Sequence, residues 1–100
     1  MANQMARLEA VVRGRVQGVG FRYLVLDFAS EIGLTGWVAN ERDGSLRCEA
    51  EGNRANLERL LELLERGPSG SRVTHVDHSW SEATGRFAGF SVRSGHHLGD

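Results

Sequence analysis

The spacing of apolar and polar positions changes along this chain, and each spacing predicts a type of element. Leu8, Ala10 and Val12 stand at every second position and share one face, which predicts a strand over residues 7–13. From residue 21 the apolar positions recur three and four apart, which predicts a helix that ends at Gly33. The apolar positions of that helix are Phe21, Leu24, Val25, Phe28, Ala29 and Ile32.

A hairpin is predicted next. Residues 35–40 and 45–51 have the composition and alternation of strands, and the turn between them contains Asp43-Gly44, a frequent hairpin pair. In the second strand apolar side chains alternate with an arginine and two glutamates, so we expect one face of the sheet to be exposed to solvent. The apolar positions of that strand are Leu46, Cys48 and Ala50.

A second helix is predicted between Asn53, a suitable N-cap, and Gly67-Pro68. Its apolar stripe is Leu57, Leu60, Leu61 and Leu64, and charged residues occupy the opposite side.

The last third of the chain predicts two strands. The first covers residues 72–80, but Val73 and Val76 are out of phase for simple alternation, so we expect a bulge or an edge position. The second covers residues 87–93. Residues 1–6 and 94–100 are expected to be loose ends.

This order of elements predicts a single domain over residues 1–100, with a core at about 7–93. Its class is a two-layer α/β sandwich of ferredoxin-like β-α-β-β-α-β topology with an extra C-terminal strand. We expect an antiparallel sheet with both helices on one face, and Phe21, Phe28 and Trp37 in the core.

Composition narrows the class of function. With 40% hydrophobic residues, 25% charged residues and a net charge of −1, the chain has an ordinary globular composition and no basic surplus for nucleic acid or an anionic membrane. Cys48 is the only cysteine, so no internal disulfide is possible. No apolar run has the length of a signal-peptide core or a membrane span, and we expect a cytoplasmic monomer.

The histidines do not predict a metal site. His75 and His78 are three residues apart in a predicted strand, so their side chains point to opposite faces. His96 and His97 lie in the predicted tail. We expect no metal and no cofactor.

The stretch Gly14-Arg15-Val16-Gln17-Gly18-Val19-Gly20-Phe21-Arg22 joins the first predicted strand to the first helix. Glycines let several backbone N–H groups converge, and a helix N-terminus adds partial positive charge. A guanidinium at residue 22 could hold two oxygens of a phosphoryl or carboxylate group. These features indicate an anion site, most simply for phosphate. A flexible glycine turn with solvated arginines is the alternative.

Two common nucleotide loops are excluded. The chain has no lysine, which a Walker-type loop requires, and Tyr23 stands where a dinucleotide loop needs its third glycine.

The topology also places Asn40 near this loop. A β-α-β unit returns the second strand in the direction of the first, so the loop and Asn40 lie at the same end of the sheet. If the third strand lies between the first two, these two strand ends are ~10 Å apart.

Two segments, GRVQGVGFR and GWVANERDG, resemble the signature blocks of the acylphosphatase family, and the resemblance extends from about Leu8 to Val92. It implies a metal-free hydrolase that cleaves the carboxyl-phosphate anhydride of small acyl phosphates. It further implies that Arg22 binds the phosphoryl group and that Asn40 positions the attacking water. Many relatives have arginine where this chain has Ala39. The loop residues expected to hold the other phosphate oxygens are Arg15, Val16, Gln17, Gly18, Val19 and Gly20.

Two further hypotheses remain open. One is a non-catalytic module on the same fold that binds phosphate or a phosphometabolite. The other is RNA binding, because RNA-recognition domains share this topology. RNA binding on this fold needs aromatic side chains on the open face of the sheet, and the third predicted strand offers Ser45, Arg47, Glu49 and Glu51 there instead.

Overall fold

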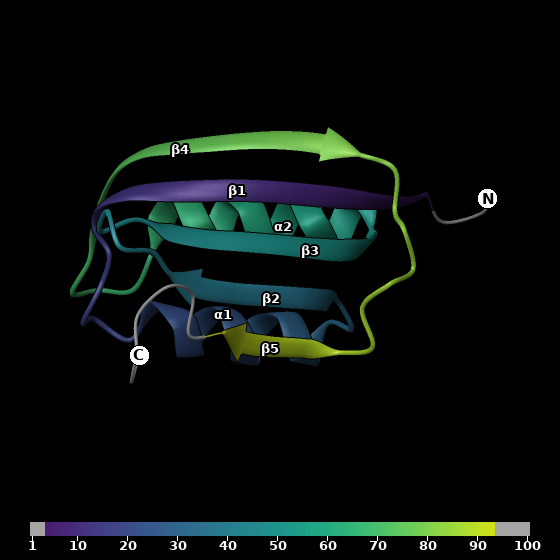
Figure 1. Ribbon diagram of the computed structural model, residues 1–100, viewed down its shortest axis with the longest axis horizontal. Coiled ribbons are helices and arrows are strands. Elements are labelled where there is room, and N and C mark those ends of the chain that lie inside the picture. Colours follow the sequence, from purple (N-terminus) through teal and green to yellow (C-terminus); the bar gives the residue numbers. More distant parts are fainter. Residues whose placement is uncertain (1–3, 94–100) are drawn as a thin grey trace.

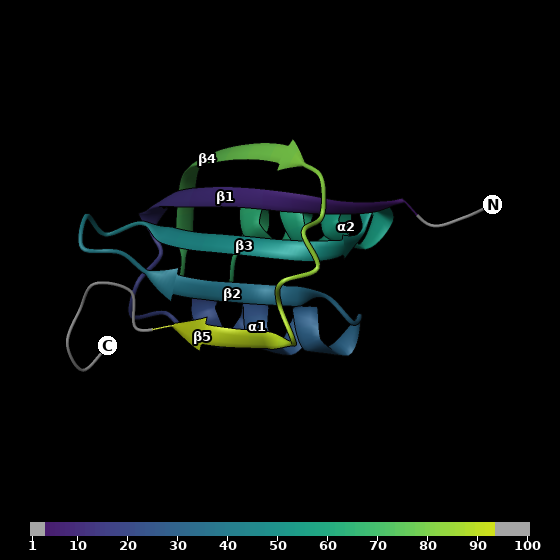
Figure 2. The same ribbon diagram turned by 45° about the vertical axis from the view of Figure 1, so that its right-hand side comes forward.

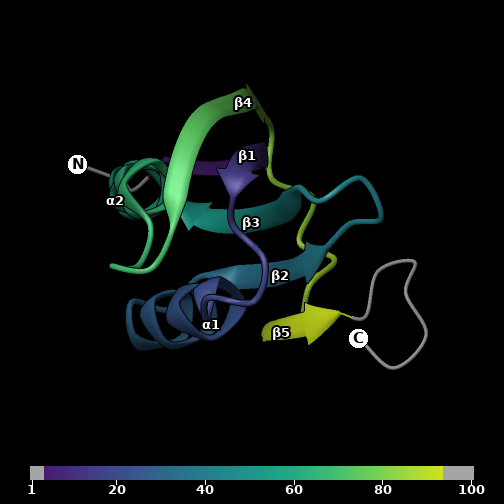
Figure 3. The ribbon, with the colours of Figure 1, turned by 90° about the vertical axis from the view of Figure 1, so that its left-hand side faces the viewer.

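A computed structural model of the chain describes residues 4–93. The described elements form two layers, in which both helices cover one face of a single sheet (Figures 1 and 3). This arrangement confirms the predicted ferredoxin-like sandwich. In chain order the elements are β1 (Met5–Arg15), α1 (Phe21–Glu31), β2 (Thr35–Asn40), β3 (Leu46–Asn53), α2 (Arg54–Arg66), β4 (Arg72–Ser81) and β5 (Phe90–Arg93).

The strand order across the sheet is β4-β1-β3-β2-β5. The first three pairings are antiparallel, as predicted, but β5 pairs with β2 in parallel, so the sheet is mixed. Residues 82–89, which we call the crossing segment, cause this difference. They carry the chain from β4 at one edge to β5 at the other while its direction reverses (Figure 2).

The main core lies between the helices and one face of the sheet. The predicted apolar faces of β1 and β3 point into it, and most of their side chains are fully buried. A fully buried leucine side chain stabilises the fold by about 2 kcal/mol. The buried leucines of α2 therefore contribute much of the free energy that holds this helix against the sheet. The helix residues that are buried in this core are Phe21, Val25 and Ala29 from α1, and Leu57, Leu60 and Leu64 from α2.

Several strand boundaries differ from the prediction by one to three residues. β1 begins at Met5 instead of residue 7, because β3 continues to Asn53 and offers Met5 and Ala6 partners. β5 begins only at Phe90, because the crossing segment is still passing over the sheet at residues 87–89. The parts of the predicted loose ends at residues 1–3 and 94–100 lie outside the described residues.

β4 is both an edge strand and bulged, as its irregular pattern predicted. Its register against β1 shifts between Arg13 and Gly14, which leaves Thr74 as the extra residue and turns Val73 and Val76 to the same side. Gly14 has φ of +125°, and a Cβ there would lie 2.1 Å from the carbonyl oxygen of Arg72. Only glycine fits this position, immediately before the loop to α1.

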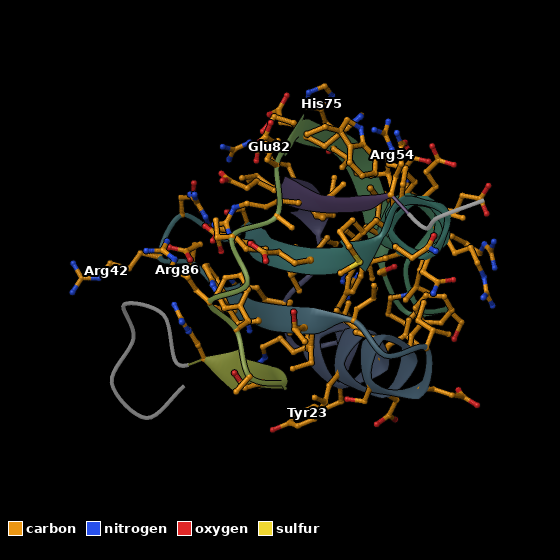
Figure 4. The ribbon with its side chains drawn as sticks, turned by 90° about the vertical axis from the view of Figure 1, so that its right-hand side faces the viewer. Tyr23, Arg42, Arg54, His75, Glu82 and Arg86 are labelled. Atoms are coloured by element: carbon orange, nitrogen blue, oxygen red, sulfur yellow. The ribbon has the colours of Figure 1, made fainter. Side chains whose placement is uncertain are left out.

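The sheet face away from the helices is less exposed than predicted. The crossing segment passes over it, and Figure 4 shows the labelled residues Glu82 and Arg86 along this path. Beneath the segment, Glu51 is only 3% exposed. Trp37 is buried as predicted, but it lies on this face, in register with Glu49, and is not part of the main core. None of the helices within residues 4–93 is long and apolar enough to cross a membrane.

Candidate active site

The connection from β1 to α1 ends in a helix start that no side chain caps. Gly20 is the N-cap residue of α1, in the left-handed conformation with φ of 82°, and no side-chain hydrogen bond caps the helix there. The first helical hydrogen bond runs from the N–H of Leu24 to the carbonyl oxygen of Gly20. The N–H groups that precede this bond have no carbonyl partner within the helix, and groups of this kind are the ones with which helix N-termini bind anions.

The electrostatics of this helix start favour negative charge. The first turn of α1 contains no acidic residue, so nothing within it offsets the positive end of the helix dipole. Arg22 lies in the same turn, and its Cζ is 5.7 Å from the centre of the Tyr23 ring.

Buried side chains hold the loop against the core. Val16 is 1% exposed and Val19 packs against the core cluster. Gly18, with φ of +74°, lies between them and is exposed, as is Gly20. The loop therefore alternates between inward-facing valines and solvent-accessible glycine backbone.

Gln17 connects this loop to the β2–β3 hairpin. Its Nε2 donates hydrogen bonds to the carbonyl oxygens of Glu41, at 2.7 Å, and Ser45, at 3.1 Å. The sequence predicts only a backbone role for Gln17, so this side-chain connection was not predicted. No local pattern could have revealed it, because the acceptors lie 24 and 28 residues further along the chain.

Asn40 lies at the same end of the sheet as the loop. β3 separates β1 from β2, so the predicted placement is confirmed, and Figure 3 looks directly at this end. Asn40 is in register with the buried Leu46 and therefore faces the helix layer, whereas Ala39 faces the opposite side beside Arg47. We call this end of the molecule, with residues 16–22 and Asn40, the loop pole.

The side chain of Asn40 is the most unusual polar group at the loop pole. The residue is 7% exposed, and its buried Oδ1 accepts no hydrogen bond from residues 4–93. Most buried polar atoms in folded proteins have a partner, because an unpaired one costs about 1–3 kcal/mol. An acceptor that the fold leaves unpaired at the loop pole is available to a ligand.

Arg15 lies at the margin of the loop pole. It is the last residue of β1, it is exposed, and it is in register with Arg72 of β4. The structure therefore gathers the loop backbone, Arg22 and Asn40 at one end of the sheet, with Arg15 beside them.

Other charged candidates have structural roles. The carboxylate of Asp43 accepts hydrogen bonds from the backbone N and the Oγ of Ser45, which with Arg13 lower the pKa of Asp43 to about 2. This is turn chemistry, as predicted. His75 Nε2 lies 2.7 Å from Asp77 Oδ1, and residues 4–93 contain no cluster of three ligating side chains that could hold a metal ion.

The fold and the loop pole together define a small α/β-sandwich protein with a helix start that no side chain caps at one pole, a geometry suited to an anion. Within this class, residues 8–92 match the acylphosphatase family, and the chain belongs to that family.

Individual proteins agree with this assignment. The acylphosphatase of Salinibacter ruber is 51% identical over 87 residues, which cover 87% of this chain and 92% of that protein. The crystal structure of the Bacillus subtilis acylphosphatase matches with a TM-score of 0.84 and 36% identity, over 88% of this chain and 98% of that one. The Coxiella burnetii acylphosphatase structure matches with a TM-score of 0.83 and 34% identity, over 90% and 94%.

Proposed function

We propose that this chain hydrolyses the carboxyl-phosphate anhydride of small acyl phosphates, releasing a carboxylate and phosphate, and that the loop pole is its active site. Membership of the acylphosphatase family makes the chain an acylphosphatase. The observation that carries the assignment of the site is the buried Oδ1 of Asn40, an acceptor without a partner in residues 4–93, at the same pole as the uncapped start of α1.

In this proposal the phosphoryl group binds to Arg22 and to the backbone N–H groups of residues 15–20. The planar guanidinium donates two parallel hydrogen bonds to phosphoryl oxygens, and the amides bind the others. The absence of acidic residues from the first turn of α1 supports this role, because no carboxylate within that turn opposes the positive end of the helix dipole. The charge that develops on the phosphoryl oxygens in the transition state meets donors that are already in place.

Asn40 orients the nucleophile. Its Oδ1 accepts a hydrogen bond from a water molecule and thereby directs the water oxygen at phosphorus, opposite the acyl oxygen. A bond forms between that oxygen and phosphorus, and the bond from phosphorus to the acyl oxygen breaks. The departing carboxylate takes the electron pair, and a phosphoryl oxygen of the substrate takes the proton of the water.

This reaction needs no general acid. The leaving carboxylate is stable as an anion at neutral pH, so nothing has to protonate it. Phosphoryl transfer depends mainly on positioning and on charge stabilisation. Arginine and preorganised amides can supply both, in the place where many phosphoryl-transfer enzymes use a divalent metal.

The proposal extends to a monomer that acts in the cytoplasm on a free small molecule. Met5 and Tyr23, the large hydrophobic side chains that are exposed among residues 4–93, lie on different elements and do not suggest an apolar interface. Analytical ultracentrifugation at micromolar concentration tests the oligomeric state, and a sedimenting dimer contradicts this part of the proposal.

The activity is tested by measuring phosphate release from acetyl phosphate and benzoyl phosphate, with and without EDTA. We expect turnover of both substrates at rates that the chelator leaves unchanged. If the folded protein binds inorganic phosphate but releases none from either substrate, the chain is a non-catalytic phosphate-binding module. If EDTA abolishes turnover, the metal-free mechanism is wrong.

A further inference from the structure

Tyr23 presents a large aromatic surface to solvent at the loop pole. Among residues 4–93, Met5 and Tyr23 are the exposed large hydrophobic side chains, at 61% and 58%. Met5 begins β1, at the opposite pole, whereas Tyr23 directly follows Arg22 in the first turn of α1. Figure 4 shows Tyr23 at the lower edge of the molecule, below α1. Its ring therefore has an open surface available to a ligand that binds at the helix start.

The ring lies beside the group assigned to the phosphate. The Cζ of Arg22 is 5.7 Å from the ring centre, within the range of a cation–π contact. In an acyl phosphate the carbonyl carbon is only two bonds from phosphorus, and the acyl substituent begins one bond further on. When the phosphoryl group is bound to Arg22, a flat acyl substituent of about six carbons is long enough to reach from there to the ring of Tyr23.

We propose that Tyr23 contacts the acyl group of the substrate and favours acyl phosphates with flat, apolar acyl groups over those with a methyl group. This inference rests on the proposed function. The physical reason is that an aromatic acyl group covers part of the exposed ring and removes apolar surface of both partners from water. An acetyl group is too small to cover much of it. Because the ring is open on one side, the preference is modest.

A purely electrostatic role of Tyr23 makes a different prediction. If the ring only steadied the guanidinium of Arg22, its loss would weaken the hold on the phosphoryl group, which all substrates share. Every acyl phosphate would then be affected equally, and inorganic phosphate would inhibit more weakly. The ratio of kcat/KM for benzoyl phosphate to kcat/KM for acetyl phosphate cancels this shared effect and reports only the acyl contact.

The experiment compares this ratio in the wild type, Tyr23→Ala, Tyr23→Phe and Met5→Ala. We expect Tyr23→Ala to lower the ratio about 3- to 10-fold, the size of an aromatic contact, mainly through KM for benzoyl phosphate. Tyr23→Phe keeps the ring and should keep the ratio. Met5→Ala removes an equally exposed apolar side chain at the opposite pole and should also keep it. Thermal unfolding of each variant verifies that it folds.

The outcomes separate this inference from the function on which it rests. If the wild type is active and Tyr23→Ala leaves the ratio within two-fold of its original value, Tyr23 does not contact the acyl group. An equal loss for both substrates overturns the inference in the same way. If the folded wild type hydrolyses neither substrate, the proposed function itself fails.

Discussion

Two polar regions at opposite poles of this molecule differ in how completely the fold satisfies them. At the far pole, beneath the crossing segment, Glu51 accepts hydrogen bonds from Arg7, from the N and Oγ1 of Thr84 and from the N of Gly85, at 2.7–3.0 Å. At the loop pole, Asn40 is similarly buried, yet its Oδ1 accepts no hydrogen bond from residues 4–93. Two buried polar residues can therefore have different roles, and the hydrogen-bond partners that the fold provides distinguish them.

The difference separates groups that hold the structure from groups that await a ligand. A buried carboxylate with several donors attaches the segments that supply them, and here Glu51 attaches the crossing segment to β3. A buried acceptor without a partner contributes nothing comparable to stability, so its presence is explained by binding. The far pole should govern stability and the loop pole activity, and the following variants test this division in order of expected effect.

Arg22→Ala should have the largest effect on activity. We expect kcat/KM to fall by at least ~10²–10³-fold, because the variant loses both phosphate binding and stabilisation of transition-state charge. The unfolding free energy should change little. Arg59→Ala on α2 is a matched control, since the Cζ of Arg59 lies 5.6 Å from the ring of Phe28 and has no proposed contact with substrate. Steady-state kinetics that show wild-type activity for Arg22→Ala would remove Arg22 from the site.

Asn40→Ala should separate binding from turnover. We expect kcat to fall about 10²-fold or more, while the inhibition constant of inorganic phosphate stays within about three-fold. The amide is proposed to orient water and not to hold phosphate. Inhibition kinetics and thermal unfolding are measured on the same preparation. A variant that keeps its kcat, or that loses phosphate affinity in step with kcat, contradicts the proposed role.

Glu51→Gln should have the opposite profile. The variant removes the most deeply buried of the three carboxylate partners of Arg7, which keeps Glu9 and Glu49, and it replaces an acceptor by a donor beside Thr84. We expect a loss of about 3 kcal/mol in unfolding free energy. The activity at 25 °C should remain, because Glu51 lies at the far pole. Urea unfolding measures the loss. Glu58→Gln, which breaks only the exposed pair with Arg54, is the control and should cost far less.

The pH dependence of stability sharpens the same test. Burial alone would raise the pKa of Glu51, but hydrogen bonds from Thr84, Gly85 and Arg7 outweigh it and lower the pKa from 4.5 to about 2. A carboxyl group whose pKa is lower in the folded state stabilises the protein above its unfolded pKa. This contribution should disappear as the pH falls from about 4.5 to about 2. Glu51→Gln should flatten the stability profile in that range, and an unchanged profile would contradict this account.

Gln17→Ala should have the smallest effect. The loop loses its two hydrogen bonds to the β2–β3 hairpin, so the positions of the loop amides relative to Asn40 become less well defined. We expect kcat/KM to fall about 2- to 10-fold, which corresponds to one or two neutral hydrogen bonds. Asn56→Ala is the control, since its Nδ2 donates to the carbonyl oxygen of Ile32, beyond the far end of α1. An equal loss in both variants would indicate a general effect on the fold.

Most of the fold could be predicted because its signals are local. The 2- and 3.6-residue periods predicted the helices and strands in the right order, and they predicted the buried sides of β1, β3, α1 and α2. The cap at Asn53 and the turn at Asp43 were predicted from single residues, and both have the expected hydrogen bonds. The loop and Asn40 were predicted to lie at the same end of the sheet because the two strands of a β-α-β unit run in the same direction.

The remaining features depend on segments that are distant in the sequence. Alternation shows that a strand has two faces but not what covers each one, so the burial of Glu51 and Trp37 on the open face could not be predicted. The parallel pairing of β5 depends on the path of the crossing segment over three strands. The side-chain hydrogen bonds of Gln17 form only when the loop and the β2–β3 hairpin pack together, and the same packing leaves Oδ1 of Asn40 buried without a partner in residues 4–93. The sequence by itself determined the elements and the candidate chemistry, whereas only the tertiary structure decided which polar groups are satisfied, because hydrogen-bond partners are set by proximity in space.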